Sequence, residues 1–339
     1  MNTRTERLRK RLFDTDPRIC PERCIYFTES MKETEGKPNA LRRSQAFYDV
    51  LSRMTVYVNA DELIVGNQAQ WPKASPIYPE YSTDWLEAEL NGTPFFPDKR
   101  PGDKFYYTQE DKDKILECVD YWKGKSLYEN LRKTLPEKIN QAWDANVIDD
   151  TWVSAAGLGN VIVDYKGVVD KGLSDVMRRI ENKLKRLDPR EPGNTRKRWF
   201  LEAALQGNQA VVMFSGRIAD CCKEQAEQEK DETRRRELLK LEDICRNVPL
   251  NPARTFHEAV QSIYMILLAV HLESNGHAIS LGRFDQYVNP YYKRDLEEGR
   301  ITREEALEIV ECFFIKCNEL NKLRSWPDTE FFPGIPDVH

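Results

Sequence analysis

The most apolar stretch of the chain, Ser262–Leu272, limits what the protein can fold into. Its sequence is SIYMILLAVHL, and its 11 residues fall short of the roughly 18 that a helix needs to cross a bilayer. Thr255 and Glu258 precede it at the spacing of a capping box, in which the hydroxyl binds the third backbone N–H and the carboxylate reaches back. The sequence therefore predicts a capped helix, running to about Glu273, that is buried in a protein core.

The composition is that of a folded, mildly acidic protein. The 339 residues are 40% apolar and include 51 Lys and Arg against 56 Asp and Glu, which gives a net charge of −5. The length suggests one large domain or two ordinary ones, at about 150 residues per domain. Because a nucleic-acid-binding protein usually has a basic surplus, we expect no nucleic acid as partner, and the lack of an apolar span argues against a membrane.

The N-terminus and the cysteines favour the cytoplasm. Met1–Asp14 is basic but lacks the apolar region of a secretory signal. None of the eight cysteines forms a CxxC pair, and most fall in helical apolar patterns, where a thiol packs as a small hydrophobic group. We expect no metal site and no disulfide, which is typical of a reducing compartment, and predict a cytoplasmic location.

Helical patterns fill most of the chain, with apolar residues recurring at three- and four-residue spacing and Thr108 and Thr302 placed as caps. Helices are predicted at 3–13, after Pro21, and at 39–53, 83–90, 108–122, 126–143, 165–187, 195–229, 231–246, 255–273, from Pro290 on, and 302–321. Short β-branched runs predict strands at 55–58, 62–65, 161–163, 278–281 and 329–332. The fold class is therefore α/β and predominantly helical.

Polar residues collect where the apolar helix ends. Gly276 permits a turn, and His277 and Ser280 follow on a short strand, at a helix-to-strand junction of the kind where pockets form. His277 could instead cap the helix C-terminus, where a cation is favoured. Asn160 follows a glycine-rich turn and could orient a substrate hydroxyl or carbonyl. The alternative for Asn160 is a turn residue that tolerates a left-handed conformation.

Sequence motifs of several common catalytic sites do not occur. GxGxxG, GxxxxGK[ST], HExxH and GxSxG are all missing from the sequence. The residues by themselves thus suggest a pocket near His277 and supply neither a catalytic residue nor a mechanism.

One segment near that pocket resembles a known family. ESNGHAISLGRFDQYVNPYY, at residues 273–292, is similar to glycyl radical enzymes of the pyruvate formate-lyase type, and more closely to their dehydratase and lyase branch. Four further segments match in the same order along the chain: Cys20–Cys24 (CPERC), Asp61–Asn67 (DELIVGN), Pro76–Tyr81 (PIYPEY) and Arg254–Ala259 (RTFHEA). The resemblance extends to about Phe332.

The resemblance implies a barrel of two five-stranded half-barrels enclosed by helices, of which this chain forms the first part. In the family, a separate radical-SAM activating enzyme oxidises a glycine near the C-terminus to a glycyl radical. That radical takes a hydrogen atom from a loop cysteine, and the resulting thiyl radical takes one from the substrate. The resemblance thus implies a homodimeric lyase or dehydratase of anaerobic metabolism that cleaves a C–C, C–O or C–N bond of a small polar substrate.

Neither reactive loop of the family occurs in this sequence, since both the G-C-x-E motif of the cysteine and the R-V-x-G-Y motif of the glycine are missing. We therefore expect residues 1–332 to be the N-terminal part of such an enzyme, ending inside the first half-barrel, and 333–339 to be an atypical tail from a truncation or frameshift. Alone, the chain is expected to have no catalytic residue, no bound cofactor and no activity. The alternatives are a helical binding or assembly module and one half of a split enzyme.

Two residues can be carried over from the family. His277 matches the histidine of the family's GHS or GHA motif, which in glycerol dehydratase contacts the substrate. The serine of that motif is Ala278 here, so a hydroxyl hydrogen bond is missing. Asn160 matches a position where dehydratases often have a second histidine, and this departure weakens an assignment to glycerol or diol dehydration. The expected substrate-binding residues are His277, Asn160, Ala278 and Ser280.

Overall fold

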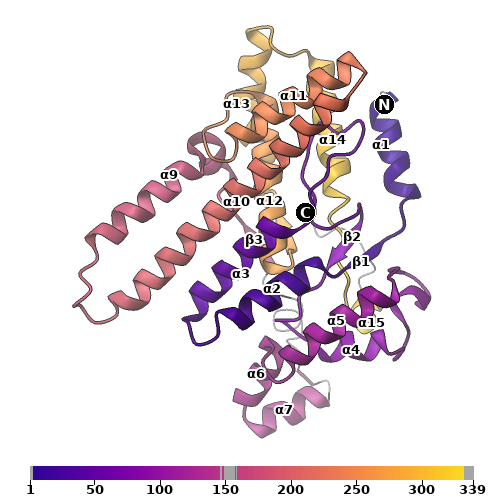
Figure 1. Cartoon of the computed structure of the whole chain (residues 1–339), viewed down its shortest axis with the longest axis vertical. Helices are drawn as coiled ribbons and strands as arrows, with labels where there is room; N and C mark the ends of the chain where they lie inside the picture. The colour runs from indigo at the N-terminus through magenta and orange to yellow at the C-terminus, as the bar shows by residue number, and fades with distance from the viewer. Residues whose placement is uncertain (1–2, 146, 149–156, 158, 332–339) are drawn as a thin grey trace.

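Helix α12 (Phe256–Ser274) runs through the middle of the structure and is buried along almost its whole length (Figure 1). The computed structural model describes residues 3–145, 147–148, 157 and 159–331. The helices packed around α12 are α9 (Tyr165–Arg186), α10 (Asn194–Gln228), α11 (Glu232–Asn247), α13 (Phe284–Glu297) and α14 (Arg303–Cys317). The apolar stretch therefore forms a core helix, as the sequence predicts.

The N-terminal helices cover one side of this core. Helices α2 (Glu22–Glu33) and α3 (Asn39–Arg53) pack against each other, and α3 lies along α10 (Figure 1). Helix α1 (Thr3–Asp14) packs on α14. The helices predicted at 3–13, after Pro21 and at 39–53 are all confirmed.

A smaller apolar cluster is built around two further helices, α4 (Asp84–Leu90) and α5 (Gln109–Trp122). The chain between and after them forms the short helices η1 (Pro97–Lys99), α6 (Leu127–Thr134) and α7 (Glu137–Asp144). The single helix predicted at 126–143 is wrong. It is two helices, because Pro136 has no N–H to donate and disfavours a helical residue before it.

Two parallel strand pairs complete the described structure. Strand β1 (Arg18–Cys20) pairs with β2 (Ala74–Pro76), and neither was expected, since three residues are too few to show an alternating pattern. Strand β3 (Gly159–Ile162) pairs with β4 (His277–Ser280), close to the strands predicted at 161–163 and 278–281. The combination of helices and short parallel strands confirms the predominantly helical α/β class.

The strands predicted at 55–58 and 62–65 are wrong, because this stretch binds side chains and has no neighbouring strand in the described structure. The N–H of Tyr57 donates to Asn67 Oδ1 at 3.3 Å. Gln261 of α12 binds both backbone groups of Val65, accepting from its N–H at 3.0 Å and donating to its carbonyl at 2.8 Å. The β-branched residues of these two runs correctly indicate an extended backbone. They do not indicate which groups that backbone binds.

Two further expectations near the C-terminal end are also wrong. The strand predicted at 329–332 is helix α15 (Trp326–Phe331) over its described residues, and residue 332 lies outside them. Pro290 does not begin a helix. It lies inside α13, which begins earlier in the chain, at Phe284.

Side-chain caps begin several helices. Thr108 and Thr302 form complete capping boxes. At α12, the hydroxyl of Thr255 accepts from the Glu258 N–H at 3.2 Å, as predicted. The Glu258 carboxylate, however, binds the backbone N–H and the guanidinium of Arg254, so the predicted box is only half formed.

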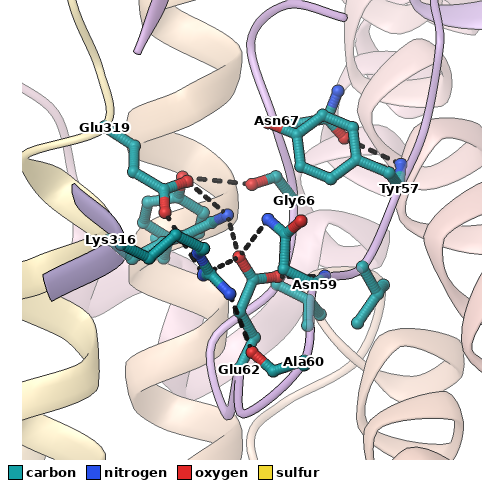
Figure 2. Close-up of polar contacts among 12 residues, drawn as sticks. Tyr57, Asn59, Ala60, Glu62, Gly66, Asn67, Lys316 and Glu319 are labelled. Atoms are coloured by element: carbon teal, nitrogen blue, oxygen red, sulfur yellow. Dashed lines mark hydrogen bonds and ion pairs between the residues drawn. The ribbon is translucent and has the colours of Figure 1, made fainter. Parts of the chain in front are cut away.

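A buried ion network joins α14 to α1 and to the segment before Asn67 (Figure 2). The Lys316 ammonium donates to Glu62 Oε1 at 2.8 Å and to Glu319 Oε2 at 2.7 Å. Arg11 of α1 approaches Glu62 at 3.2 Å. Burial by itself would lower the pKa of Lys316, but the two carboxylates raise it, so the ammonium stays charged and holds the three segments together.

Among the described residues, every helix is too short or too polar to cross a membrane. The eight cysteines form no disulfide with one another, and all except the half-buried Cys221 are buried. Cys20 and Cys24 lie in β1 and α2 as packing groups, not as a redox pair.

Replacing Lys316 by methionine would remove the buried cation between Glu62 and Glu319 and leave only the partly exposed Arg11 near the two carboxylates. We expect the free energy of unfolding to fall by about 3–5 kcal/mol, measured by urea denaturation followed by circular dichroism. Lys10→Met is the matched control, because it removes only an exposed pair with Asp14, and it should cost less than about 1 kcal/mol. Equal losses in the two variants would contradict the role assigned to the network.

Candidate functional site

The parallel pairing of β3 with β4 brings together residues from distant parts of the chain. Gly159 lies opposite His277, and Ile162 lies opposite Ser280, which places Asn160 beside Ala278. Asn160 is exposed, whereas Ala278 and Ser280 are half-buried. His277 begins β4 with its backbone, and its side chain lies outside the described part of the structure. The four residues predicted as a binding set therefore share one short sheet.

The backbone at this sheet is held in an uncommon conformation. Asn160 has φ 55°, Ala278 has φ 52° and Asn275, which ends α12, has φ 65°. Left-handed φ values are rare for residues with a side chain, least so for asparagine, and they persist only where the surroundings enforce them. The left-handed conformation considered for Asn160 from its sequence context is confirmed.

Side chains from α2, α3 and the segment after β2 enforce the geometry by binding the C-terminal carbonyls of α12. Arg23 Nε donates to the carbonyl of Leu272 at 2.7 Å, and Tyr78 Oη donates to that of His271 at 2.8 Å. Arg43 Nη2 donates to the carbonyl of Glu273 at 2.6 Å. The last carbonyls of a helix have no partner within it, so these three donors determine where α12 ends and the turn begins.

The donors are themselves held by charge. Arg23 and Glu80 form an ion pair with both side chains buried, with Arg23 Nη2 2.6 Å from Glu80 Oε1. The Arg23 guanidinium also stacks on the Tyr78 ring, 3.7 Å from its centroid. Burial by itself would lower the pKa of Arg23, but the Glu80 carboxylate raises it, so the guanidinium stays charged at the helix end.

Tyr81 holds the outer donor, Arg43. Its phenol oxygen accepts from Arg43 Nη2 at 2.7 Å, and the Glu273 carboxylate pairs with the same guanidinium. Burial raises the pKa of Tyr81 to about 12, so the phenol stays neutral at physiological pH. The turn after α12 is therefore tied to α3 through neutral and charged partners together.

Two glycines allow the segments to approach each other. A Cβ at Gly157 would lie 2.5 Å from the carbonyl oxygen of Ser274, so only glycine lets the chain before β3 reach the end of α12. A Cβ at Gly276 would overlap the His271 ring, and Gly276 also has φ 55°. The turn that leads into His277 depends on both.

The sheet offers polar groups that can form hydrogen bonds. Ser280 Oγ accepts from the Gly282 N–H at 3.1 Å, which leaves its own proton available to donate. Asn160 presents an amide that can both donate and accept. Within the described ranges, no group of three or more His, Cys, Asp or Glu side chains could hold a metal ion. The arrangement suits hydrogen bonding to a small polar molecule.

Reasoning from the sequence missed the residues that position this sheet: Arg23, Arg43, Tyr78, Glu80 and Tyr81. Several lie in CPERC and PIYPEY, segments that drew notice only for their resemblance to a family. The available signal was the charged residues inside these short motifs, Arg23 in CPERC and Glu80 in PIYPEY, since such a charge is buried only when it is paired.

Comparison with known proteins identifies the family. A family model described as pyruvate formate lyase-like matches residues 1–339. The chain belongs to this family of glycyl radical enzymes. It is 37% identical over 312 residues to the isethionate sulfite-lyase of Nitratidesulfovibrio vulgaris, a match that covers 89% of this chain and 37% of the relative.

Solved structures of the family have the same fold. The structure described for 1,2-propanediol dehydration in Roseburia inulinivorans matches with a TM-score of 0.94 and 37% identity, over 98% of this chain and 39% of that one. The glycerol-bound form of the B12-independent glycerol dehydratase from Clostridium butyricum gives a TM-score of 0.93 and 33% identity, over 98% and 41%. The expected fold, part of a glycyl radical enzyme barrel, is confirmed, and the chain spans about two fifths of these relatives.

Substituting Gly276 tests the close approach at the turn. Gly276→Ala adds a clash with His271 to the cost of a left-handed alanine, and we expect the free energy of unfolding to fall at least about 2 kcal/mol further than in the control. Gly36→Ala is that control, because Gly36 also has a positive φ but open space around it, and should cost about 1–2 kcal/mol. Similar losses in urea denaturation would show that the turn has room for a side chain.

Substituting Arg23 tests the ion pair at the end of α12. Arg23→Met strands Glu80 in the core, and we expect a loss of about 3–5 kcal/mol, of which the double variant Arg23→Met/Glu80→Gln regains a part. Arg53→Met breaks an exposed pair with Glu29 and should cost less than about 1 kcal/mol. Additive losses in the double variant, measured by urea denaturation, would mean that the two side chains are not coupled.

Proposed function

We propose that this chain is the N-terminal portion of a glycyl radical lyase or dehydratase and contributes one wall of its substrate pocket. In the complete enzyme, the reaction is cleavage of a C–C, C–O or C–N bond in a small polar molecule. The observation that carries the proposal is the pairing of Gly159–Ile162 with His277–Ser280, which gathers the four expected binding residues on one sheet. The names of the relatives, a sulfite-lyase and a glycerol dehydratase among them, support the reaction class.

Each residue has a distinct role in the proposal. His277 and Asn160 orient the substrate by hydrogen bonds to its hydroxyl or carbonyl oxygens. Ser280 adds a hydroxyl donor. Ala278 contributes the left-handed backbone of β4 and lacks the hydroxyl that a serine would offer. Without that hydroxyl the sheet offers one hydrogen bond fewer to a polyol, so it binds glycerol less favourably than a sheet with serine at this position would.

The radical chemistry requires residues that these 339 do not include, since neither the G-C-x-E nor the R-V-x-G-Y motif occurs in them. A glycyl radical, installed by a radical-SAM activating enzyme, would supply hydrogen-atom abstraction from the substrate. In the proposal this chain holds and orients the substrate, is inactive alone, and works in the cytoplasm as part of a homodimeric enzyme of anaerobic metabolism.

Electron paramagnetic resonance tests the assignment. We expect no glycine-centred doublet when this chain alone is incubated anaerobically with S-adenosylmethionine and an activating enzyme of the family. With a polypeptide that carries both loop motifs, we expect the doublet and turnover of a small polar molecule such as a sulfonate. A doublet from this chain alone would contradict the proposal.

A substitution tests the binding wall in the reconstituted enzyme. His277→Ala should lower kcat/KM by roughly tenfold or more, the effect of losing one hydrogen bond of about 1.5 kcal/mol. Asn182→Ala, on the exposed face of α9, is the control and should change it by less than about twofold. Unchanged turnover in His277→Ala would show that this sheet does not line the substrate pocket. If the unsubstituted chain forms the complex but the complex shows no turnover, the result would favour an assembly module.

A further inference from the structure

The loop between α9 and α10 forms the tip of a helical hairpin that projects from the rest of the molecule (Figure 1). Residues 178–198 of this tip include nine Lys and Arg but only three Asp and Glu, a net charge of +6. Because the whole chain carries −5, the remainder carries −11. The tip therefore carries a local excess of positive charge on a chain that is acidic as a whole.

Much of this charge is not neutralised by the residues that the structure describes. Four of the arginines pair with nearby carboxylates: Arg178, Arg179, Arg190 and Arg198. Lys183, Lys185, Arg186 and Arg196 are exposed and form no ion pair with any described residue. Like charges gathered at one tip repel each other, and a negatively charged partner relieves that repulsion.

Helix stability does not account for all of these cations. Lys183, Lys185 and Arg186 lie in the last turn of α9, where the helix dipole favours positive charge. Arg196 and Lys197 lie in the first turn of α10, where the dipole disfavours it, and that turn has no acidic residue. The helix dipole therefore gives no reason for Arg196 and Lys197 at this end of α10, which favours a role for Arg196 in an interaction outside the helix.

An exposed aromatic ring lies beside this charge. Phe200 is 66% exposed, one turn after Arg196, and the neighbouring Trp199 is half-buried. A single ring is too little apolar surface to anchor a protein in a bilayer. An extended polyanion such as RNA would also reach the acidic remainder of the chain and be repelled by it, whereas a compact acidic surface can contact the tip alone. A protein surface can bind both the cations and the exposed ring, because it can present carboxylates to the cations and an apolar recess to the ring.

We propose that the tip of the α9–α10 hairpin docks a partner protein that presents an acidic surface with an apolar recess for Phe200. The docking surface consists of Lys183, Lys185, Arg186, Arg196 and Phe200. It is separate from the β3–β4 sheet, so the proposal does not depend on the proposed reaction.

Fluorescence anisotropy tests the docking surface with a labelled, glutamate-rich helical peptide that has one leucine-lined face. We expect the full chain to bind the peptide more weakly at about 0.15 M than at about 0.05 M NaCl, because salt screens exposed charges. The triple variant Lys183→Gln/Lys185→Gln/Arg186→Gln should weaken binding by about tenfold. Phe200→Ser should weaken it by about threefold or more, with all variants keeping the circular dichroism spectrum of the parent.

A second triple variant removes the same charge elsewhere. Lys230→Gln/Arg235→Gln/Arg236→Gln, at and near the start of α11, should change the affinity by less than about twofold. If the two triple variants lose affinity for the peptide equally, the loss depends on overall charge and not on the tip, which would overturn the proposal. Absence of peptide binding, or tighter binding to single-stranded RNA or to phosphatidylglycerol vesicles than to the peptide, would also overturn it.

Discussion

Helix α12 is buried along almost its whole length, and the rest of the structure depends on satisfying its polar groups. His257 Nε2 lies 2.6 Å from the Leu63 carbonyl, Gln261 binds Val65, and Tyr264 Oη donates to the Gly66 carbonyl at 3.2 Å. A buried polar group without a partner costs free energy, so each of these side chains determines the course of the segment it meets. The DELIVGN segment is extended because it runs along α12 and pairs with its side chains.

The same requirement shapes the candidate site at the other end of the helix. The final carbonyls of α12 are bound by Arg23, Arg43 and Tyr78, which lie near the N-terminus of the chain. These donors set the turn from which β4 departs, and β4 in turn pairs with β3. Segments that resemble the family in sequence are therefore joined physically: one holds the helix end, and another continues from it toward the expected binding residues.

Local signals predicted the helices well. Thr108 and Thr302 cap their helices through neighbouring residues, and Asn39–Arg53 begins and ends as predicted, because caps and apolar spacing act within one or two turns. Strands depend on a partner elsewhere in the chain. The run at 62–65 has the composition of a strand, yet Gln261 binds Val65 in place of a neighbouring strand. Pro136 divides a predicted helix by a local rule that the apolar pattern concealed.

The sequence by itself determined where most helices begin and end, the burial of Ser262–Leu272 and the membership of a family, because each depends on residues close together in the chain or on a motif. Only the tertiary structure decided that Asn160 lies beside Ala278, that Arg23 pairs with Glu80, and that Lys316 joins two distant carboxylates. These pairings involve residues far apart in the sequence. A buried charge needs a partner, but the sequence does not show which distant residue that partner is.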